Sequence, residues 1–370
     1  MHSKEGVCAR SKIQLPFYSI MSSSSSSSKT KLYPLFDSLQ AEPNPQWWHR
    51  GLGFAVVGIF VVTWISSLFS PLLLAWSLQT GHHALTIGIV TISIISYLPW
   101  KRGALCHAWQ GAVCFAHYRL YQSTRLFVEG DDNNDDQSTA AAILQNYPDP
   151  TFFAVHTHGA FCLGWSCIFH NPLWAKRPIQ FCFAPALYAS PFFRLFARCT
   201  GYPGSASKAS MQACMKQGAM DVALPPGGFE EATIHSQQQD RVFIQKRTGF
   251  IKLCLQHGYH VRPVYTFGEK QTFWNAQGFW KLRLALNRLV FPAILVWGQP
   301  LCPILPKRNL DMVVVIGKPL VLPHISNPSR EVVQEWHAKY VQALQALFET
   351  HKEMAYGRDQ GGKDCKIEVW

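Results

Sequence analysis

The sequence predicts an α/β protein in which a mixed sheet flanked by helices is preceded by an N-terminal transmembrane helical hairpin. Two observations carry this prediction. Uncharged apolar stretches occupy residues 51–78 and 84–100, whereas after about residue 103 short runs rich in Val, Ile and Phe alternate with longer mixed segments. Such alternation is typical of an α/β domain with a largely buried sheet. A chain of 370 residues is long enough to bury a core of this kind.

The net charge of the chain is +12, from 34 Lys and Arg against 22 Asp and Glu. This excess favours an anionic partner: nucleic acid, an acidic membrane surface or a phosphate-bearing substrate. The basic residues are scattered among Trp, Phe and Leu, so no nucleic-acid partner is expected. The 11 cysteines stand mostly in apolar runs without a CxxC pair. They indicate a reducing compartment, with neither a disulfide framework nor a zinc site.

Residues 1–47 are predicted to be disordered. They are polar, with several prolines and an unbroken serine run from Ser22 to Ser28. A segment of this composition cannot bury enough apolar surface to offset its chain entropy. No apolar stretch follows Met1 at the distance of a secretory signal. The Ser-rich, weakly basic character leaves a plastid or mitochondrial address open.

The membrane hairpin is predicted for residues 48–102, with helices at about 52–78 and 84–100. Crossing a bilayer requires roughly 20 apolar residues, and the first stretch exceeds that length. Arg50 precedes the first stretch, Lys101 and Arg102 follow the second, and the linker between them carries no Lys or Arg. The positive-inside rule then places both ends of the hairpin on the cytosolic side. The alternative is two helices of a soluble core, but soluble helices of this length usually show a polar face.

Residues 103–370 are predicted to form one domain that carries the chemistry. Four segments have the composition of strands that end at a turn or polar residue: Thr151–Val155, Ala219–Leu224, Val261–Phe267 and Met312–Ile316. Three segments have the pattern of helices: Ser207–Gln217, Thr248–His257 and the amphipathic Glu331–Met354.

The first candidate for catalysis is His156-Thr157-His158-Gly159, at the end of a predicted strand. The two-residue period of a strand places both imidazoles on one face, and His is the usual general base near neutral pH. Gly159 allows a sharp turn and a close approach of a ligand to the backbone. Taken alone, the pattern leaves two other interpretations open: metal ligands lacking a nearby third ligand, and satisfied core histidines.

The second candidate is the run from Leu224 to Ala232, where a predicted strand ends at Pro-Pro-Gly-Gly and two carboxylates, Glu230 and Glu231, open a helix. In the functional interpretation, Gly227 and Gly228 expose backbone N–H groups while one carboxylate orients the catalytic imidazole. The structural alternative is an ordinary type II turn with acidic residues at a helix start.

The third candidate is the pair Arg247 and Lys252, placed to meet an anion near a helix N-terminus. For these two residues alone a solvated basic face is the stronger interpretation. The sequence contains no GxSxG, Walker, GxGxxG or HExxH motif. The motifs that usually indicate a serine hydrolase, a nucleotide-dependent enzyme or a zinc peptidase are therefore missing.

In order along the chain, these segments resemble the type-2 diacylglycerol acyltransferase family, which includes monoacylglycerol and wax-alcohol acyltransferases. The family's HPHG motif is similar to His156–Gly159, and its glycine pair followed by a carboxylate is similar to Gly227–Glu231. The most specific part is RTGFIKLCLQHGYHVRPVYTFGE, Arg247 to Glu269. The resemblance runs from about residue 48 to 357 and implies a glycerolipid-acyltransferase-like fold.

The resemblance also implies roles for individual residues. His158, or alternatively His156, is the general base, and Glu231, or less readily Glu230, supplies the orienting carboxylate. Substrate-binding positions are Gly159, Gly227, Gly228, Glu230, Arg247, Lys252 and Glu269. One departure stands out: Thr157 replaces the family's proline between the histidines, which loosens the backbone there. It bears on rate or acceptor preference more than on reaction class.

The implied reaction moves a fatty acyl group from acyl-CoA to a hydroxyl of diacylglycerol, giving triacylglycerol. Acyl-CoA is a co-substrate, and neither a cofactor nor a metal is expected. Alternative acceptors are a monoacylglycerol, a wax alcohol and a lysophospholipid, and a non-catalytic lipid-binding membrane protein is the alternative of another class. The resemblance implies the endoplasmic reticulum membrane with both termini cytosolic, and leaves a lipid droplet, a plastid and a homo-oligomer open.

Overall fold

The computed structural model describes residues 30–38, 46–99, 101–130, 139–145, 147, 149–171, 178–218, 220–288, 293–357 and 362–370. The expected disorder of residues 1–29 lies outside these ranges, as does the end of the second predicted hairpin helix.

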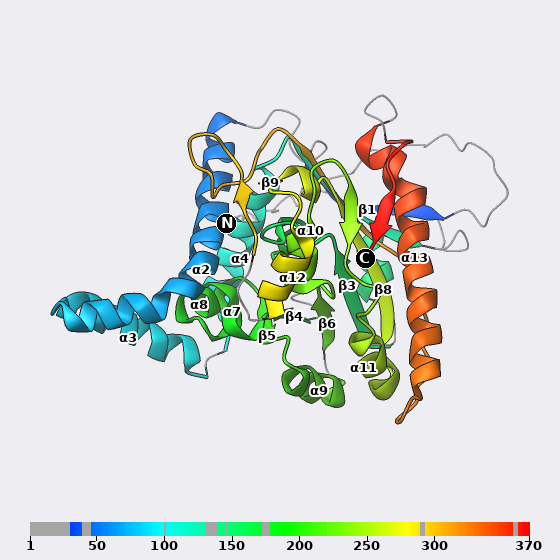
Figure 1. The fold of residues 1–370 in the computed structure, drawn as a ribbon, viewed down its shortest axis with the longest axis horizontal. Coiled ribbons are helices and arrows are strands. Elements are labelled where there is room, and N and C mark those ends of the chain that lie inside the picture. The colour runs from blue at the N-terminus through cyan, green and yellow to red at the C-terminus, as the bar shows by residue number, and fades with distance from the viewer. Residues whose placement is uncertain are drawn as a thin grey trace, which may run out of the picture.

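The fold is centred on a mixed sheet whose eight described strands lie in the order β1-β2-β11-β8-β3-β6-β4-β5 (Figure 1). Strand β3 pairs in parallel with both β6 and β8, whereas β11 runs antiparallel to β8. The strands are β1 Lys31–Asp37, β2 Ser123–Gly130, β3 Thr151–His156, β4 Ile179–Phe183, β5 Tyr202–Ser205, β6 Asp221–Leu224, β8 His260–Phe267 and β11 Asp311–Ile316. The predicted mixed sheet is confirmed.

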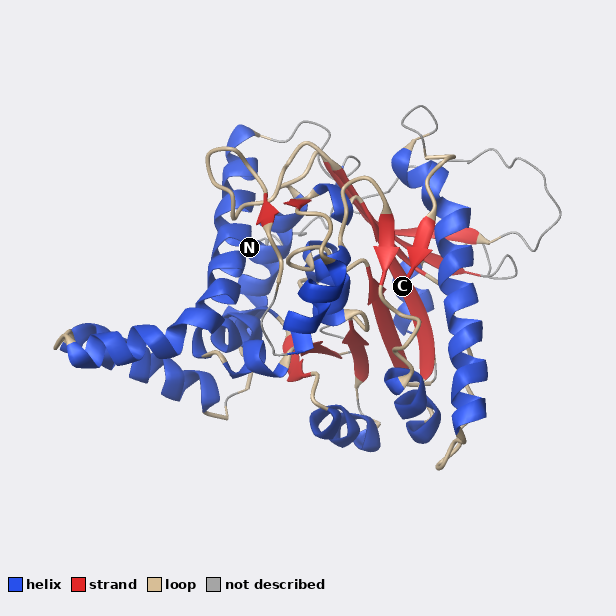
Figure 2. Cartoon of the chain, in the orientation of Figure 1, coloured by secondary structure: helices blue, strands red, loops and turns tan. Residues whose placement is uncertain are grey.

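Alternate residues of the central strands face opposite layers of helices. In β3, Phe153 and Val155 belong to one buried cluster and Phe152 and Ala154 to the other, as a two-residue period requires. The first cluster packs helices α2, α4, α6 and α8 on the sheet, and the second packs α9, α11 and α13. Figure 2 shows helices on both sides of the strands.

The helices of these layers are α2 Trp47–Gln79, α4 Ala104–Tyr118, α6 Leu163–Phe169, α8 Pro191–Thr200, α9 Lys208–Gln217, α11 Gly249–His257 and α13 Arg330–Tyr356. Smaller elements are α3 His83–Tyr97, α5 Ala140–Gln145, α7 Pro185–Ala189, α10 Gly228–Ile234, η2 Glu269–Gln271 and α12 Trp280–Arg288. Two short sheets pair β9 Trp274–Asn275 with β10 Val296–Trp297, and β7 Asp240–Val242 with β12 Ile367–Val369.

Helix α2 belongs partly to the body of the protein and partly to a projecting arm. Its first half packs against α4 and α8 and buries Phe60 and Val61. Its C-terminal part, beyond Pro71, projects from the body together with α3 (Figure 1). The two helices of this arm lie side by side, and Thr86 Oγ1 donates to Ser77 Oγ at 2.9 Å.

The predicted stretch 52–78 is therefore helical throughout, whereas the helix predicted for 84–100 ends at Tyr97, and the described Leu98 and Pro99 lie outside it. Among the described residues, one helical segment, Trp47–Ser67, is long and apolar enough to cross a membrane. Helix α3 has 15 residues, fewer than the roughly 20 that a span requires. A hairpin that crosses the membrane stays a prediction.

The structure corrects the expectation that all of residues 1–47 are disordered. Lys31–Asp37 form β1, which pairs antiparallel with β2 and buries Tyr33. The apolar residues in the middle of this segment gain a partner strand from far along the chain, which local composition does not reveal. The sheet therefore begins before the apolar helices, and a domain boundary at residue 103 does not hold for it.

Candidate active site

The candidate residues meet at one edge of the sheet, where three neighbouring parallel strands end. His156 is the last residue of β3, Leu224 the last of β6, and Phe267 the last of β8. Since β3 lies between β6 and β8, the loops that follow these strands lie next to one another. In α/β sheets this carboxyl edge is the usual place for a ligand site.

Glu231 accepts hydrogen bonds from three different residues at the site. It is 1% exposed, and its carboxylate accepts from His156 Nδ1 at 3.0 Å, from the His158 backbone N–H at 2.8 Å and from the Phe243 N–H at 2.9 Å. Burial alone raises the pKa of Glu231, but the charge and hydrogen bond of His156 and the Phe243 N–H outweigh it and hold the pKa below its ordinary value. Glu231 is therefore ionised at neutral pH.

Gly227 is the residue that lets Glu231 fold back to this position. A Cβ at Gly227 would lie 2.1 Å from Glu231 Oε2, so any side chain there would displace the carboxylate. Gly228 and Gly159 both have positive φ, at 55° and 56°, a conformation that glycine adopts without strain. The glycines predicted from the sequence thus shape the two loops around the histidines.

His156 is held at both ring nitrogens. Nδ1 donates to Glu231, and Nε2 lies 3.0 Å from the hydroxyl of Tyr340 on α13. The residue has no exposed surface. With an ionised carboxylate at one nitrogen and a hydroxyl donor at the other, the imidazole has no free position for a substrate proton.

His158 is held differently, with one ring nitrogen available. Its Nδ1 lies 3.0 Å from the Gly159 carbonyl, which can only accept, so Nδ1 carries the proton and Nε2 the lone pair. No hydrogen bond to Nε2 occurs among the described residues. Burial lowers the pKa of His158 below its ordinary value, against the opposing effects of the Gly159 carbonyl and Glu231. The imidazole is therefore neutral near pH 7, as a general base requires.

Glu269 lies behind this loop and has no exposed surface. Its carboxyl group accepts from the N–H groups of Leu163 and Gly164, at 3.1 and 2.6 Å, at the start of α6. A Cβ at Gly159 would lie 2.3 Å from Glu269 Oε1, so the loop packs directly on the carboxyl group. Burial raises the pKa of Glu269 to about 8. The structure makes Glu269 a support of the loop, whereas the sequence predicted a substrate contact.

The remaining predicted residues lie toward the surface. Arg247 pairs with Glu230, with Nη2 and Oε2 2.5 Å apart, and both side chains are partly exposed. Lys252 is exposed on α11, and no described contact joins it to the histidines. The structure thus brings the histidines, Glu231, Glu269 and the glycines together, places the Glu230–Arg247 pair beside them, and leaves Lys252 apart.

Sequence reasoning missed two polar residues at the site. Tyr340 of α13 was given no role at the site, although a tyrosine hydroxyl on the core face of a helix is itself a signal of a buried partner. His235, at the end of α10, donates from Nε2 to the Lys270 carbonyl at 3.0 Å, while its buried Nδ1 has no described partner. Burial lowers the pKa of His235 to about 4, and the charge of His158 adds to this effect.

Comparisons with known proteins identify relatives of this chain. A family model described as diacylglycerol acyltransferase matches residues 86–361. Acyl-CoA wax alcohol acyltransferase 1 of Homo sapiens is 29% identical over 277 residues, which cover 69% of this chain and 80% of that protein. Diacylglycerol O-acyltransferase 2 of Dictyostelium discoideum is 30% identical over 247 residues, which cover 61% of this chain and 74% of that protein.

Among solved structures, the 1-acyl-sn-glycerophosphate acyltransferase of Thermotoga maritima is similar at 14% identity with a TM-score of 0.34, covering 75% of this chain and 95% of that chain. A superposition this loose does not bear on the function of the chain.

Proposed function

Because this chain belongs to the diacylglycerol acyltransferase family, we propose that it transfers a fatty acyl group from acyl-CoA to the free hydroxyl of diacylglycerol, releasing triacylglycerol and CoA. The chain is an O-acyltransferase of neutral lipids, as its relatives are. The observation that carries the choice of mechanism is the neutral imidazole of His158, whose Nε2 is left without a described hydrogen bond while every nitrogen of His156 is engaged.

In the proposed mechanism, His158 Nε2 removes the proton from the acceptor hydroxyl as its oxygen attacks the thioester carbonyl carbon. The tetrahedral intermediate then collapses, the C–S bond breaks, and the CoA thiolate takes the proton from the imidazolium. Glu231 does not touch the His158 ring. It fixes His158 through its backbone N–H and fixes the adjacent His156 through Nδ1. No covalent enzyme intermediate is required, because a thiolate is a good leaving group.

The developing oxyanion needs a backbone donor near His158. The Gly228 N–H already donates to the Pro225 carbonyl at 3.2 Å, whereas the Gly159 N–H makes no described hydrogen bond. We assign the oxyanion to the Gly159 N–H, an interaction commonly worth about 3 kcal/mol. Arg247, beside the site in its pair with Glu230, is the group proposed to meet a CoA phosphate, with the more distant Lys252 as an outlying cation.

The projecting arm is proposed to enter one leaflet of the membrane. It exposes large apolar side chains, among them Leu72, Trp76, Ile87 and Ile94. The exposed polar residues Gln79, Thr80, His82 and His83 lie at the turn between its two helices. The 15 residues of α3 extend roughly 22 Å at about 1.5 Å per residue, less than a hydrocarbon core of about 30 Å. Both ends of the arm then lie on one side, which is the cytosolic side in our proposal. The endoplasmic reticulum is the proposed membrane, with lipid droplets and plastids as alternatives.

The proposal is tested by acyl transfer from labelled oleoyl-CoA in microsomes that contain the full chain or its variants His158→Ala, Glu231→Ala and Lys208→Ala. Diacylglycerol, monoacylglycerol, a long-chain alcohol and lysophosphatidate are offered in parallel. We expect triacylglycerol from the unmodified chain and from Lys208→Ala, an exposed position on α9, and background levels from the other two. Transfer to lysophosphatidate alone would contradict the neutral acceptor, and transfer to none of the four would favour a lipid-binding protein.

A further inference from the structure

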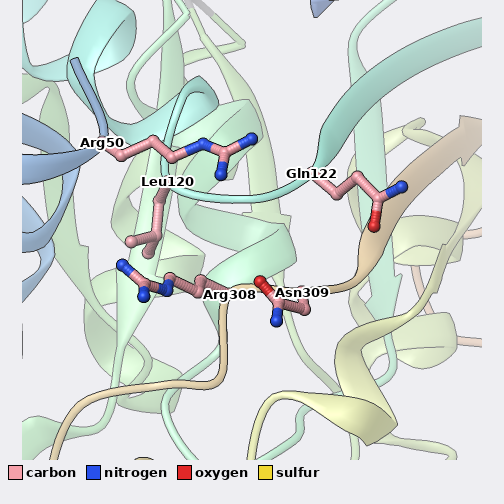
Figure 3. Close-up of a pocket in the computed structure, with 5 residues that line it drawn as sticks. All are labelled: Arg50, Leu120, Gln122, Arg308 and Asn309. Atoms are coloured by element: carbon pink, nitrogen blue, oxygen red, sulfur yellow. The ribbon is translucent and has the colours of Figure 1, made fainter. Parts of the chain in front are cut away.

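A small pocket with two arginines lies at the same edge of the sheet as the candidate active site but on different strands. It has a volume of about 170 Å³ and is lined by Arg50, Leu120, Gln122, Arg308 and Asn309 (Figure 3). Gln122 and Asn309 stand just before β2 and β11. These strands follow β8 in the sheet, whereas His156 and Glu231 lie in the loops after β3 and β6. Neither the proposed chemistry nor the family motifs use this pocket.

Backbone contacts hold the lining segments of this pocket together. The Gln122 N–H donates to the Leu310 carbonyl at 3.0 Å, and the Lys307 N–H to the Thr272 carbonyl at 2.8 Å. A Cβ at Gly53 would lie 2.7 Å from the Ala116 carbonyl oxygen, so glycine lets α2 approach the end of α4 closely. That approach brings Arg50 over Leu120. The segments that line the pocket are therefore held in place by contacts within the protein.

The charged residues that line the pocket are two arginines, and no acidic residue stands among its described lining residues. Figure 3 shows Arg50 and Arg308 on opposite sides of Leu120, with Asn309 beside Arg308 and Gln122 farther away, its amide directed away from both arginines. In the part of the chain that the structure describes, no Asp or Glu forms an ion pair with either arginine. The nearby Asp311 accepts a hydrogen bond from Ser123. Guanidinium groups match the oxygens of a phosphate bidentately, and the amides add neutral donors.

The size and surroundings of the pocket indicate which kind of molecule would carry the bound phosphate. At about 170 Å³ it is smaller than the roughly 300–1,000 Å³ of sites that enclose a whole small molecule, so it fits a phosphate group rather than a nucleotide. Arg50 lies one turn from the start of α2, where Trp47 is 87% and Trp48 46% exposed. Tryptophans at the end of an apolar helix typically mark the level of lipid headgroups.

We propose that Arg50, Arg308, Gln122 and Asn309 bind the phosphate of an anionic phospholipid headgroup. The phosphate chemistry follows from the pocket alone. The lipid as its source rests on the membrane attachment proposed above, but it does not depend on the acyl-transfer reaction. Bound there, the headgroup fixes the N-terminal end of α2 at the membrane surface, at the opposite end of this helix from the arm.

The test measures binding to the purified full chain in an uncharged detergent, followed by thermal shift and intrinsic fluorescence. The probes are dihexanoyl-phosphatidate, dihexanoyl-phosphatidylcholine, inorganic phosphate and coenzyme A. The double variant R50Q/R308Q is compared with K208Q/R330Q, which removes two exposed positive charges elsewhere. The single variants R50Q and R308Q, together with the unfolding temperature without ligand, show whether either change disturbs the fold.

We expect the unmodified chain and K208Q/R330Q to bind phosphatidate equally, and R50Q/R308Q to bind it at least about tenfold more weakly. Phosphatidylcholine, whose phosphate is neutralised by choline, should bind more weakly than phosphatidate to the unmodified chain. Equal binding of every probe by all variants would overturn the site. Loss of coenzyme A or inorganic phosphate binding in R50Q/R308Q, with phosphatidate binding retained, would overturn the lipid as the source of the phosphate. Because no acyl transfer is measured, these outcomes are separate from those of the proposed reaction.

Discussion

The hydroxyl of Tyr340 lies 3.0 Å from Nε2 of His156, and this contact joins the C-terminal helix α13 to the loop that carries both histidines. The two residues are 184 positions apart in the sequence, and both are fully buried. A hydrogen bond in such a place fixes the ring of His156 and, through Glu231, the backbone of His158.

Tyr340→Phe should therefore lower kcat with little change in KM, since it removes support from the histidine loop and leaves the substrate surface alone. It should also cost about 1–3 kcal/mol of stability, because His156 Nε2 is left buried without a partner. Tyr259→Phe is the matched control, since the buried Tyr259 hydroxyl donates to the Met220 carbonyl away from the site. Equal kinetic effects of the two variants would contradict the role of Tyr340.

Glu231→Gln should reduce kcat by at least about 100-fold. Glu231 accepts from His156 and from the His158 and Phe243 N–H groups, and the amide nitrogen of Gln would oppose one of these donors. Glu230→Gln is the neighbouring control, because Glu230 is partly exposed and pairs with Arg247. Steady-state kinetics of both variants should show a much smaller loss for Glu230→Gln, and the reverse order would exchange the roles of the two carboxylates.

On the acid side, kcat/KM should decline only at a pH below the ordinary pKa of histidine. The active form of His158 is the neutral imidazole, and burial lowers its pKa from the ordinary value of about 6.5. Activity should therefore stay constant as pH falls from 8 to about 6.5 and decline only below that value. A profile measured with the purified enzyme and a saturating acceptor checks this, and an acid limb centred above pH 7 would be incompatible with it.

The stability of the protein should fall as pH rises through the range in which Glu269 titrates. Burial raises the pKa of Glu269 from 4.5 to about 8, so between these values the folded state holds a proton that the unfolded state has lost. The unfolding free energy then decreases with rising pH, by at most about 5 kcal/mol.

Glu269→Gln cannot titrate and should flatten this dependence, whereas Glu335→Gln, at an exposed position, should leave it unchanged. Midpoints of thermal unfolding between pH 5 and 8.5 give the comparison. An equally steep slope in Glu269→Gln would assign the dependence to another group.

Phe60→Ala should destabilise the protein by about 3–5 kcal/mol, the usual cost of emptying a buried phenylalanine site. Phe60 is 2% exposed, and its ring contacts those of Phe193 and Phe196. Phe69→Ala is the control in the same helix, since Phe69 is 56% exposed just before Pro71, where the arm begins. Chemical unfolding in detergent should separate the two variants, and similar losses would mean that the first half of α2 is not part of the core.

Much of the fold could be predicted because its central strands are apolar runs with clear ends. The predicted segment Val261–Phe267 forms most of β8, and Met312–Ile316 forms most of β11. Strand β1 was missed, since this edge strand is only partly buried and owes its conformation to a partner far along the chain. The sequence motifs identified most of the residues at the site, because the glycines and carboxylates of each motif are close together in the chain and shape the same loop.

The motifs could not show which residue of the site has which role. Which histidine has a free nitrogen depends on Tyr340, 184 positions from His156. The place of Glu269 depends on the start of α6, 105 positions before it in the chain. Such contacts are set by tertiary packing, and no spacing rule contains them.

The packing of α2 has a practical consequence for anyone who needs the enzyme without its membrane arm. The chain supplies β1 and the buried first half of α2 before it departs into the arm. It returns to the body at the end of α3, where Arg194 and Arg198 of α8 donate to the Ser96 carbonyl, and continues into α4. The arm is thus an internal insertion in the catalytic domain. Trimming from the N-terminus would strip away an edge strand and Phe60 before it reached the arm. An excision within the chain, joining the buried half of α2 to the start of α4 by a short linker, is the deletion that leaves the core intact.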